Sequence, residues 1–150
     1  MGRAQLEELS KHGSYLSNPK GRSMWPMLRS KKDIIEIRKP DRQIGRSDVV
    51  MYTRGKNDQG VIHRVYQVHE NDYIIFGDNC WWKEIIPKEK VAGLAVRFCR
   101  NGKWYDMHTS RGYRLYAWFW TNTLLIRRPI LWMRDQGKSV VRKLKKMIGK

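Results

Sequence analysis

Short runs of β-branched and aromatic residues, separated by turn residues, dominate the first hundred positions of the chain. Alternating or continuous apolar runs of this length, bounded by Gly, Pro, Asn and Asp, predict strands. Five are expected: Asp33–Arg38, Asp48–Thr53, Gly60–Val68, Asp72–Gly77 and Val91–Phe98. Closely spaced short strands favour antiparallel pairing. The pattern therefore predicts a mainly β, compact antiparallel domain.

The two ends of the chain have a helical pattern instead. The segment AQLEELSKH, ending at His12, predicts a short N-terminal helix. In Ser139–Ile148 the apolar residues recur at helical spacing, with Lys and Arg between them, so this stretch predicts an amphipathic helix. Pro129 is expected to break the C-terminal zone into two helices. The resulting division is 1–20 (helix and loop), 21–109 (β domain) and 110–150 (basic helical tail).

Composition adds a strong charge to this picture. The chain has 150 residues, 41% of them hydrophobic, and a net charge of +17. Residues 110–150 hold 11 basic side chains and one acidic one, so +10 of that charge lies in the tail. Such an excess predicts a polyanionic partner, either nucleic acid or an anionic lipid surface. The two cysteines, Cys80 and Cys99, are expected to be reduced thiols and have no metal-binding spacing, so neither a metal nor a cofactor is expected.

The first twenty residues contain no apolar run of the length a secretory signal needs, so none is expected. The longest apolar stretch, Leu115–Ile126, is shorter than a bilayer-spanning helix.

One serine and one histidine stand in unusual surroundings. Ser23 lies in the segment GRSMWPML, between a basic residue and a Met-Trp-Pro turn. His63 lies inside the apolar strand GVIHRVYQV. A catalytic serine needs a base within hydrogen-bond reach and often a third group that orients this base. Asp78 in FGDN and Glu84 six positions later are the candidate acids. Asp78 is slightly favoured, because Gly77 would permit a tight turn that aims its carboxylate at the sheet.

These segments resemble type I signal peptidases. GRSMWPML is similar to their Ser-Met-x-Pro box, and VIHRV to the histidine-arginine box of the endoplasmic-reticulum-type branch, where bacterial relatives and the LexA repressor carry a lysine. FGDN with the later acid resembles the stretch that supplies the acid of the catalytic triad in that family. IGRSDVVMY and VAG resemble two further boxes. The resemblance spans roughly Gly21–Arg97, about half of the chain.

The resemblance implies a serine endopeptidase. His63 would take the proton of Ser23, Asp78 or Glu84 would hold the imidazole, and Met24 would form part of the apolar floor of a peptide groove. Gly21 replaces a serine whose hydroxyl assists the oxyanion in many relatives, so backbone N–H groups would take over that role. Lys31 and Lys32 are alternative bases for a Ser/Lys mechanism, in a turn expected to be solvated. Arg64 should face away from His63 and form a structural ion pair.

The tail admits three interpretations. It could lie on a membrane surface, with tryptophans at the interface and cations toward anionic lipid. The residues expected to do so are Trp118, Trp120, Trp132, Arg142, Lys143, Lys145 and Lys146. It could instead pack on the β domain through Tyr113–Ile126, leaving 138–150 solvated. Nucleic-acid binding is the third interpretation and is disfavoured, because no helix-turn-helix pattern is visible.

The expected function is therefore cleavage of leader- or signal-like peptides by a peripheral membrane protein at the bacterial cytoplasmic face. The alternative is a non-catalytic basic module that binds anionic lipid or nucleic acid on a decayed peptidase scaffold. An autoproteolytic switch of the LexA type fits less well, since the lysine and the DNA-binding domain are missing.

Overall fold

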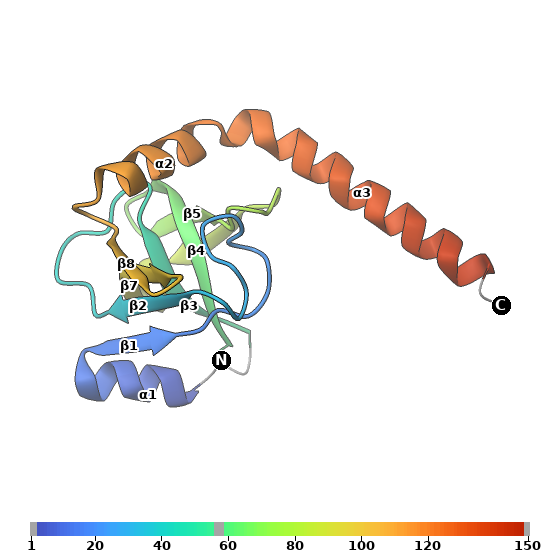
Figure 1. The fold of residues 1–150 in the computed structure, drawn as a ribbon. Coiled ribbons are helices and arrows are strands. Elements are labelled where there is room, and N and C mark those ends of the chain that lie inside the picture. The colour runs from blue at the N-terminus through green and yellow to red at the C-terminus, as the bar shows by residue number, and fades with distance from the viewer. Residues whose placement is uncertain (1–2, 56–58, 149–150) are drawn as a thin grey trace.

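The computed structural model describes residues 3–55 and 59–148. Within these ranges the chain forms a mainly antiparallel sheet of eight strands, a short N-terminal helix and two C-terminal helices (Figure 1). The elements are α1 (Arg3–His12), β1 (Ser14–Ser17), β2 (Ile34–Arg38), β3 (Val49–Arg54), β4 (Gln59–Val68), β5 (Asp72–Phe76), β6 (Glu84–Pro87), the 3₁₀ turn η1 (Lys88–Lys90), β7 (Val91–Arg100), β8 (Lys103–Asp106), α2 (Arg111–Asn122) and α3 (Leu124–Ile148). All five expected strands and the N-terminal helix are confirmed.

The strand order is β1-β2-β7-β3-β4-β5-β6, with β8 paired to β7. The sheet buries residues on both of its faces. Along β3, Val49 and Met51 join one core, which is covered by α1, the segment 24–28 and α2, while Val50 and Tyr52 join a second core with residues of β5, β6 and β7. This alternation follows from the two-residue period of a strand. It also explains why β3 reads as a continuous apolar run.

The three remaining strands are absent from the sequence prediction. Each is only four residues long, with the sequences SYLS, EIIP and KWYD. Runs this short and this polar carry no clear period. The omission of β6 matters most, because its first residue is Glu84.

The C-terminal zone does form two helices, but Pro129 does not separate them. It lies inside α3, and the boundary is at Thr123. The side chains of Thr121, Asn122 and Thr123 hydrogen-bond to carbonyls four residues earlier, at 2.8, 2.7 and 2.8 Å. Side chains that take up backbone carbonyls in this way compete with the helix. The run TNT therefore ends α2.

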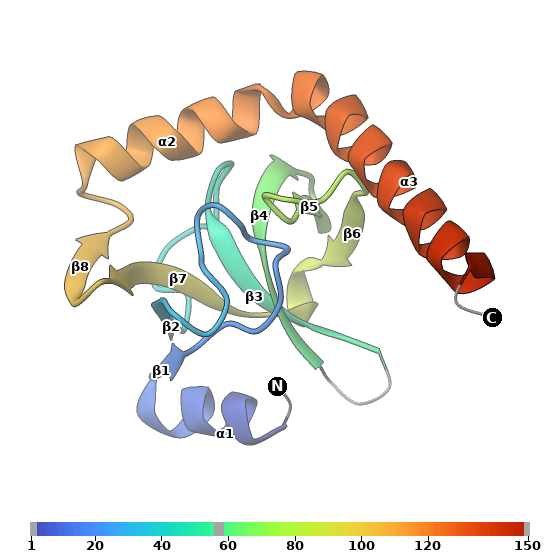
Figure 2. The ribbon, with the colours of Figure 1, turned by 45° about the vertical axis from the view of Figure 1, so that its right-hand side comes forward.

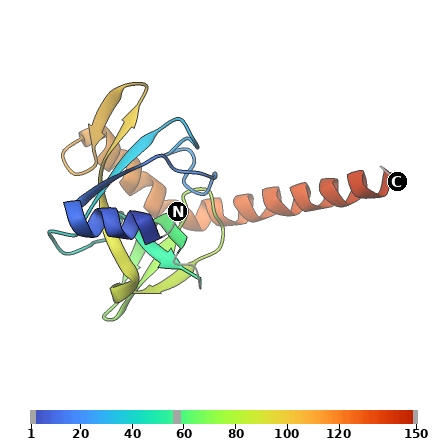
Figure 3. The same cartoon turned by 90° about the horizontal axis from the view of Figure 1, so that it is seen from below.

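The two helices differ in how they meet the sheet. α2 crosses one end of the sheet, whereas α3 extends away from it (Figures 2 and 3). Tyr113, Ala117 and Thr121 of α2 are buried, and the opposite side exposes Leu115, Trp118 and Phe119. The interpretation in which 113–126 packs on the β domain therefore holds for one side of α2 and for Leu124, whereas Leu125 and Ile126 are exposed. In the part of the chain that the structure describes, no helix has the length and apolar character needed to cross a membrane.

Candidate active site

The turn that carries Ser23 is fastened to the loop after β5. The Ser23 carbonyl accepts a hydrogen bond from the Asn79 N–H at 2.7 Å, and the Arg22 carbonyl accepts one from the Asn79 side-chain amide at 3.0 Å. Gly21 opens this turn with φ +94°, in the left-handed region that only glycine adopts readily. A serine at position 21 would strain this backbone. Gly21, where the chain differs from signal peptidases, therefore fits the backbone conformation of this turn.

His63 projects from β4 on the same face as Val50 and Tyr52. Val50 lies opposite His63 in the β3–β4 pairing, and Tyr52 is two residues further along β3. Such diagonal neighbours on one face of a sheet are close enough to touch. The Tyr52 hydroxyl lies 3.0 Å from His63 Nδ1, and the Glu84 carboxylate lies 3.4 Å from the same nitrogen. The imidazole is thus held from its Nδ1 side and is almost completely buried.

The other ring nitrogen, Nε2, faces the serine turn across Gly77. A Cβ placed on Gly77 would lie 2.7 Å from the Ser23 carbonyl oxygen and 3.0 Å from His63 Nε2. The serine backbone and the histidine ring therefore approach each other with only a glycine between them. Gly77 does not have a positive φ. The tight turn expected after Gly77 is present, closed by a hydrogen bond from the Cys80 N–H to the Gly77 carbonyl at 2.9 Å, but it is the close approach that requires a glycine at this position.

Glu84 is the acid that the structure brings to His63. A hydrogen bond with His63 holds the pKa of Glu84 at about 2, and Tyr52 and Arg54 favour the ionised form as well. Because a carboxylate only accepts hydrogen bonds, Glu84 favours the tautomer in which the facing Nδ1 carries the proton. In that tautomer Nε2 is the nitrogen with the free lone pair. Burial, together with the Glu84 charge, raises the pKa of Tyr52, so its phenol keeps its proton.

Asp78, the acid favoured from the sequence, contacts a different side chain. Its two carboxylate oxygens accept hydrogen bonds from Arg64 Nε and Nη2 at 2.7 and 2.8 Å. His63 and Arg64 are consecutive in β4 and face opposite sides, so an acid paired with one points away from the other. The preference for Asp78 as the partner of His63 is corrected accordingly. The structural ion pair expected for Arg64 is present.

The buried Arg64–Asp78 pair joins the site to α2. Arg64 Nη1 donates to the Tyr113 hydroxyl at 3.1 Å, and the Tyr116 hydroxyl donates to Asp78 at 3.0 Å. Side-chain exposure is 4% for Arg64 and 1% for Asp78. Buried charges need this degree of hydrogen bonding to be tolerated. The pair therefore fixes the loop after β5 against both the sheet and α2.

A pocket of about 210 Å³ opens beside Ser23 and His63. Gly21, Met24 and Leu28 line one part of it, and consecutive β4 residues 60–63 line another. β4 pairs with β3 from Gln59 to Arg64, whereas its pairing with β5 begins only at Arg64. The backbone of 60–63 thus has β3 along one edge and the pocket beside it. An extended peptide is the shape of ligand that fits next to a strand edge.

The rival reactive groups are placed less favourably. Lys31 and Lys32 are exposed and lie outside the lining of this pocket. Cys80 is buried next to Gly77, and burial raises the pKa of its thiol to about 12. It is therefore protonated at neutral pH and a poor nucleophile. The described residues contain no group of three or more His, Cys, Asp or Glu placed to bind a metal ion.

The residues expected at a membrane surface fall into three groups. Trp118 and Trp132 are 61% and 46% exposed. Trp120 is turned inward, and its indole N–H donates to the Asp78 carbonyl at 3.0 Å. The Arg127 guanidinium lies 4.0 Å from its ring centre, so Trp120 contacts the rest of the domain. The side chains of Arg142, Lys143, Lys145 and Lys146 lie outside the described part of the structure.

Two residues of the site escaped the sequence analysis. Tyr52 reads as an ordinary buried strand residue, and only the β3–β4 register places it beside His63. Asn79, next to Asp78 in FGDN, supports the serine turn through its backbone and its side chain. Comparisons with family models, with curated proteins and with solved structures find no match for this chain.

Proposed function

We propose that the protein is a serine endopeptidase of the signal-peptidase type, in which Ser23 is the nucleophile, His63 the general base and Glu84 the acid that orients it. One observation carries this proposal: the His63 ring is held at Nδ1 by Glu84 and Tyr52, while its Nε2 faces the Ser23 turn across Gly77. Acyl transfer by a serine requires a nucleophile, a base next to it and an acid that orients this base, in that spatial order.

The chemistry follows from the protonation of the ring. Nε2 removes the proton from Ser23 Oγ as this oxygen attacks a peptide carbonyl, and the imidazolium then protonates the leaving amine. Glu84 stabilises the positive charge on the imidazolium. A water molecule deprotonated by the same nitrogen hydrolyses the acyl-enzyme and releases Ser23. Because residue 21 is a glycine, backbone N–H groups of the turn, such as that of Ser23, are the proposed donors to the oxyanion.

The pocket supports an extended peptide substrate with small side chains. Its volume of about 210 Å³ is modest, and Met24, Leu28 and Ile62 supply apolar walls. A leader- or signal-like peptide, cut after a small residue, suits these dimensions. The strand edge at 60–63 offers backbone hydrogen bonds that do not depend on the substrate sequence.

The test is cleavage of a library of peptides with small residues at successive positions, using the purified full-length chain. Ser23→Ala should lower kcat/KM by about 10⁴-fold or more. Glu84→Gln should lower it by roughly 10²–10⁴-fold, because the ring loses the group that selects its tautomer. Ser10→Ala and Glu70→Gln are matched controls at exposed positions, and both should retain full activity.

Two results would overturn the proposal. Equal activity of the wild type and Ser23→Ala would show that another group cleaves the peptide. Inertness of the wild type across the library, with a cooperative unfolding transition, would leave a non-catalytic binding module. Circular dichroism of every variant separates loss of folding from loss of chemistry.

A further inference from the structure

α3 exposes five large apolar side chains, four of them in its first ten residues and one further along. Their exposed fractions are 70% for Leu125, 68% for Ile126, 57% for Ile130, 57% for Met133 and 52% for Val141. At 3.6 residues per turn, Ile126, Ile130, Met133 and Val141 share one side of the helix, and Leu125 lies at its margin. We call these five residues the α3 stripe. The helix itself extends well beyond the sheet (Figure 3).

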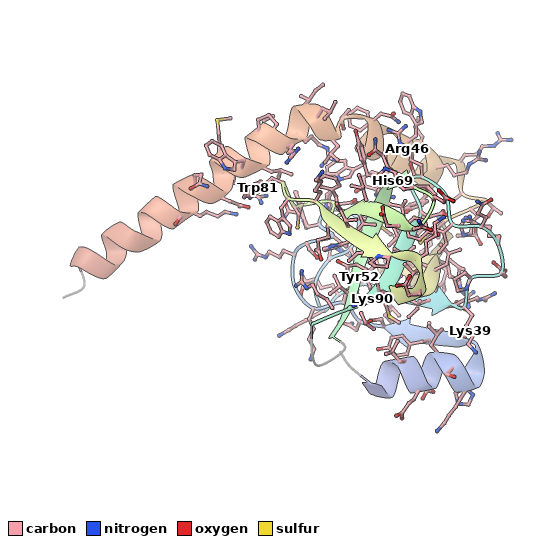
Figure 4. The ribbon with its side chains drawn as sticks, turned by 180° about the vertical axis from the view of Figure 1, so that it is seen from behind. Lys39, Arg46, Tyr52, His69, Trp81 and Lys90 are labelled. Atoms are coloured by element: carbon pink, nitrogen blue, oxygen red, sulfur yellow. The ribbon has the colours of Figure 1, made fainter. Side chains whose placement is uncertain are left out.

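Three arginines next to this stripe attach α3 to the domain. Arg127 Nη1 donates to the Asp78 carbonyl at 3.0 Å, and Arg128 Nε to the Trp81 carbonyl at 2.8 Å. Arg134 donates to the side chain and the carbonyl of Asn79 at 2.5 and 3.2 Å. Figure 4 shows Trp81 at this junction, where α3 passes the domain. The five side chains of the α3 stripe remain exposed beside these contacts, so the domain does not cover them.

A stripe of this kind on a projecting helix indicates a partner surface. The charge of the chain indicates which surface. The net charge is +17, and residues 110–150 contribute +10 of it. Two such helices would repel each other, whereas an anionic surface attracts them. Trp132, 46% exposed, adds the kind of side chain that prefers the boundary between water and lipid.

We propose that α3 is an interfacial anchor, which lies along an anionic bilayer with the α3 stripe inserted among the lipid chains. An amphipathic helix with a cationic side binds in this way, through apolar burial together with attraction to anionic headgroups. Because Asn79 contacts both α3 and the Ser23 turn, the bilayer-bound helix would hold the pocket next to the membrane surface. The anchor does not depend on the proposed catalysis.

The test is flotation of the full-length chain with vesicles. Vesicles of phosphatidylcholine mixed with phosphatidylglycerol should bind the wild type, and pure phosphatidylcholine vesicles should bind it much more weakly. Ile130→Gln/Met133→Gln changes no charge and should lower partitioning into the anionic vesicles by about 10²-fold, since each aliphatic side chain contributes roughly tenfold on burial. Leu16→Gln is the matched control, an equally exposed apolar residue on β1, and should bind as the wild type does.

Four results would overturn the anchor. The double variant could bind as well as the wild type, or the wild type could fail to bind anionic vesicles. Release by soluble glycerol phosphate would indicate a headgroup site without insertion. Dimerisation in the absence of lipid, abolished by the double variant, would assign the stripe to a second copy of the chain. The assay contains no peptide, so its failure leaves the peptidase proposal standing. The helical circular dichroism of the double variant reports whether it folds.

Discussion

Gly77 offers the sharpest test of whether Ser23 and His63 work as a pair. A Cβ at this position would lie 2.7 Å from the Ser23 carbonyl oxygen, 2.7 Å from Cys80 Sγ and 3.0 Å from His63 Nε2. A Cβ contact below 3.0 Å forces a shift, and an ordinary contact begins at 3.4 Å, so an ordinary contact with the serine carbonyl requires a displacement of about 0.7 Å. Asn79 holds that carbonyl by a hydrogen bond, so the strain falls on the Ser23 turn.

A misplacement of this size has a predictable cost. Reacting groups displaced by about 1 Å lose roughly 10²-fold in rate. Gly77→Ala should therefore reduce kcat/KM by about 10²-fold, which is about 2.7 kcal/mol of transition-state stabilisation. Overpacking should also lower the free energy of unfolding by about 1–3 kcal/mol. The assay is peptide cleavage, measured together with thermal unfolding of the same preparation.

Two further variants separate catalysis from stability. Gly77→Ala/Cys80→Ala removes the sulfur contact and should recover part of the stability, but not the activity, because the contacts with Ser23 and His63 remain. Gly112→Ala has no neighbouring atom within 4 Å and should be fully active. If Gly77→Ala cleaves peptide within twofold of the wild type, the meeting of serine and histidine across this glycine is not the basis of activity.

Two other predictions concern the acids. Asp78→Asn leaves Arg64 buried without its counter-charge and should lower the free energy of unfolding by about 3–5 kcal/mol. Asp41→Asn, an exposed control with the same charge change, should leave the free energy of unfolding unchanged. Equal effects of the two variants in denaturant titrations would contradict the importance of the buried pair. The pKa of Glu84 is about 2 in the folded chain, below its unfolded value. Its stabilising effect is therefore present above pH about 4.5 and lost as the pH falls toward 2. The stability difference between the wild type and Glu84→Gln should shrink over that range. A difference that stays constant would show that the ionised Glu84 carboxylate does not stabilise the fold through its contact with His63.

The hydrophobic pattern of the sequence was sufficient to predict the central strands of the sheet but not the short strands at its edges. β2, β3, β4, β5 and β7 carry long apolar runs that bury both faces, so their position follows from periodicity. β6 carries only Glu84, two isoleucines and a proline. It is a strand because β5 offers a hydrogen-bonding edge, with Ile75 opposite Glu84. Such a strand is a tertiary effect, which local propensity does not reveal.

The same reason explains the choice between the two acids. Along the chain, Asp78 follows β5 directly and Glu84 belongs to no recognisable element, so proximity in sequence favours Asp78. In the folded chain β6 returns along β5, and Arg54 of β3 reaches Glu84 at 3.2 Å. β3 and β6 are separated by two strands in the sheet, so their contact requires a strongly curled sheet. Curvature brings Glu84 to His63, while strand alternation directs Arg64 and Asp78 to the other face. A chain with the same motifs on a flatter sheet would leave His63 without its acid.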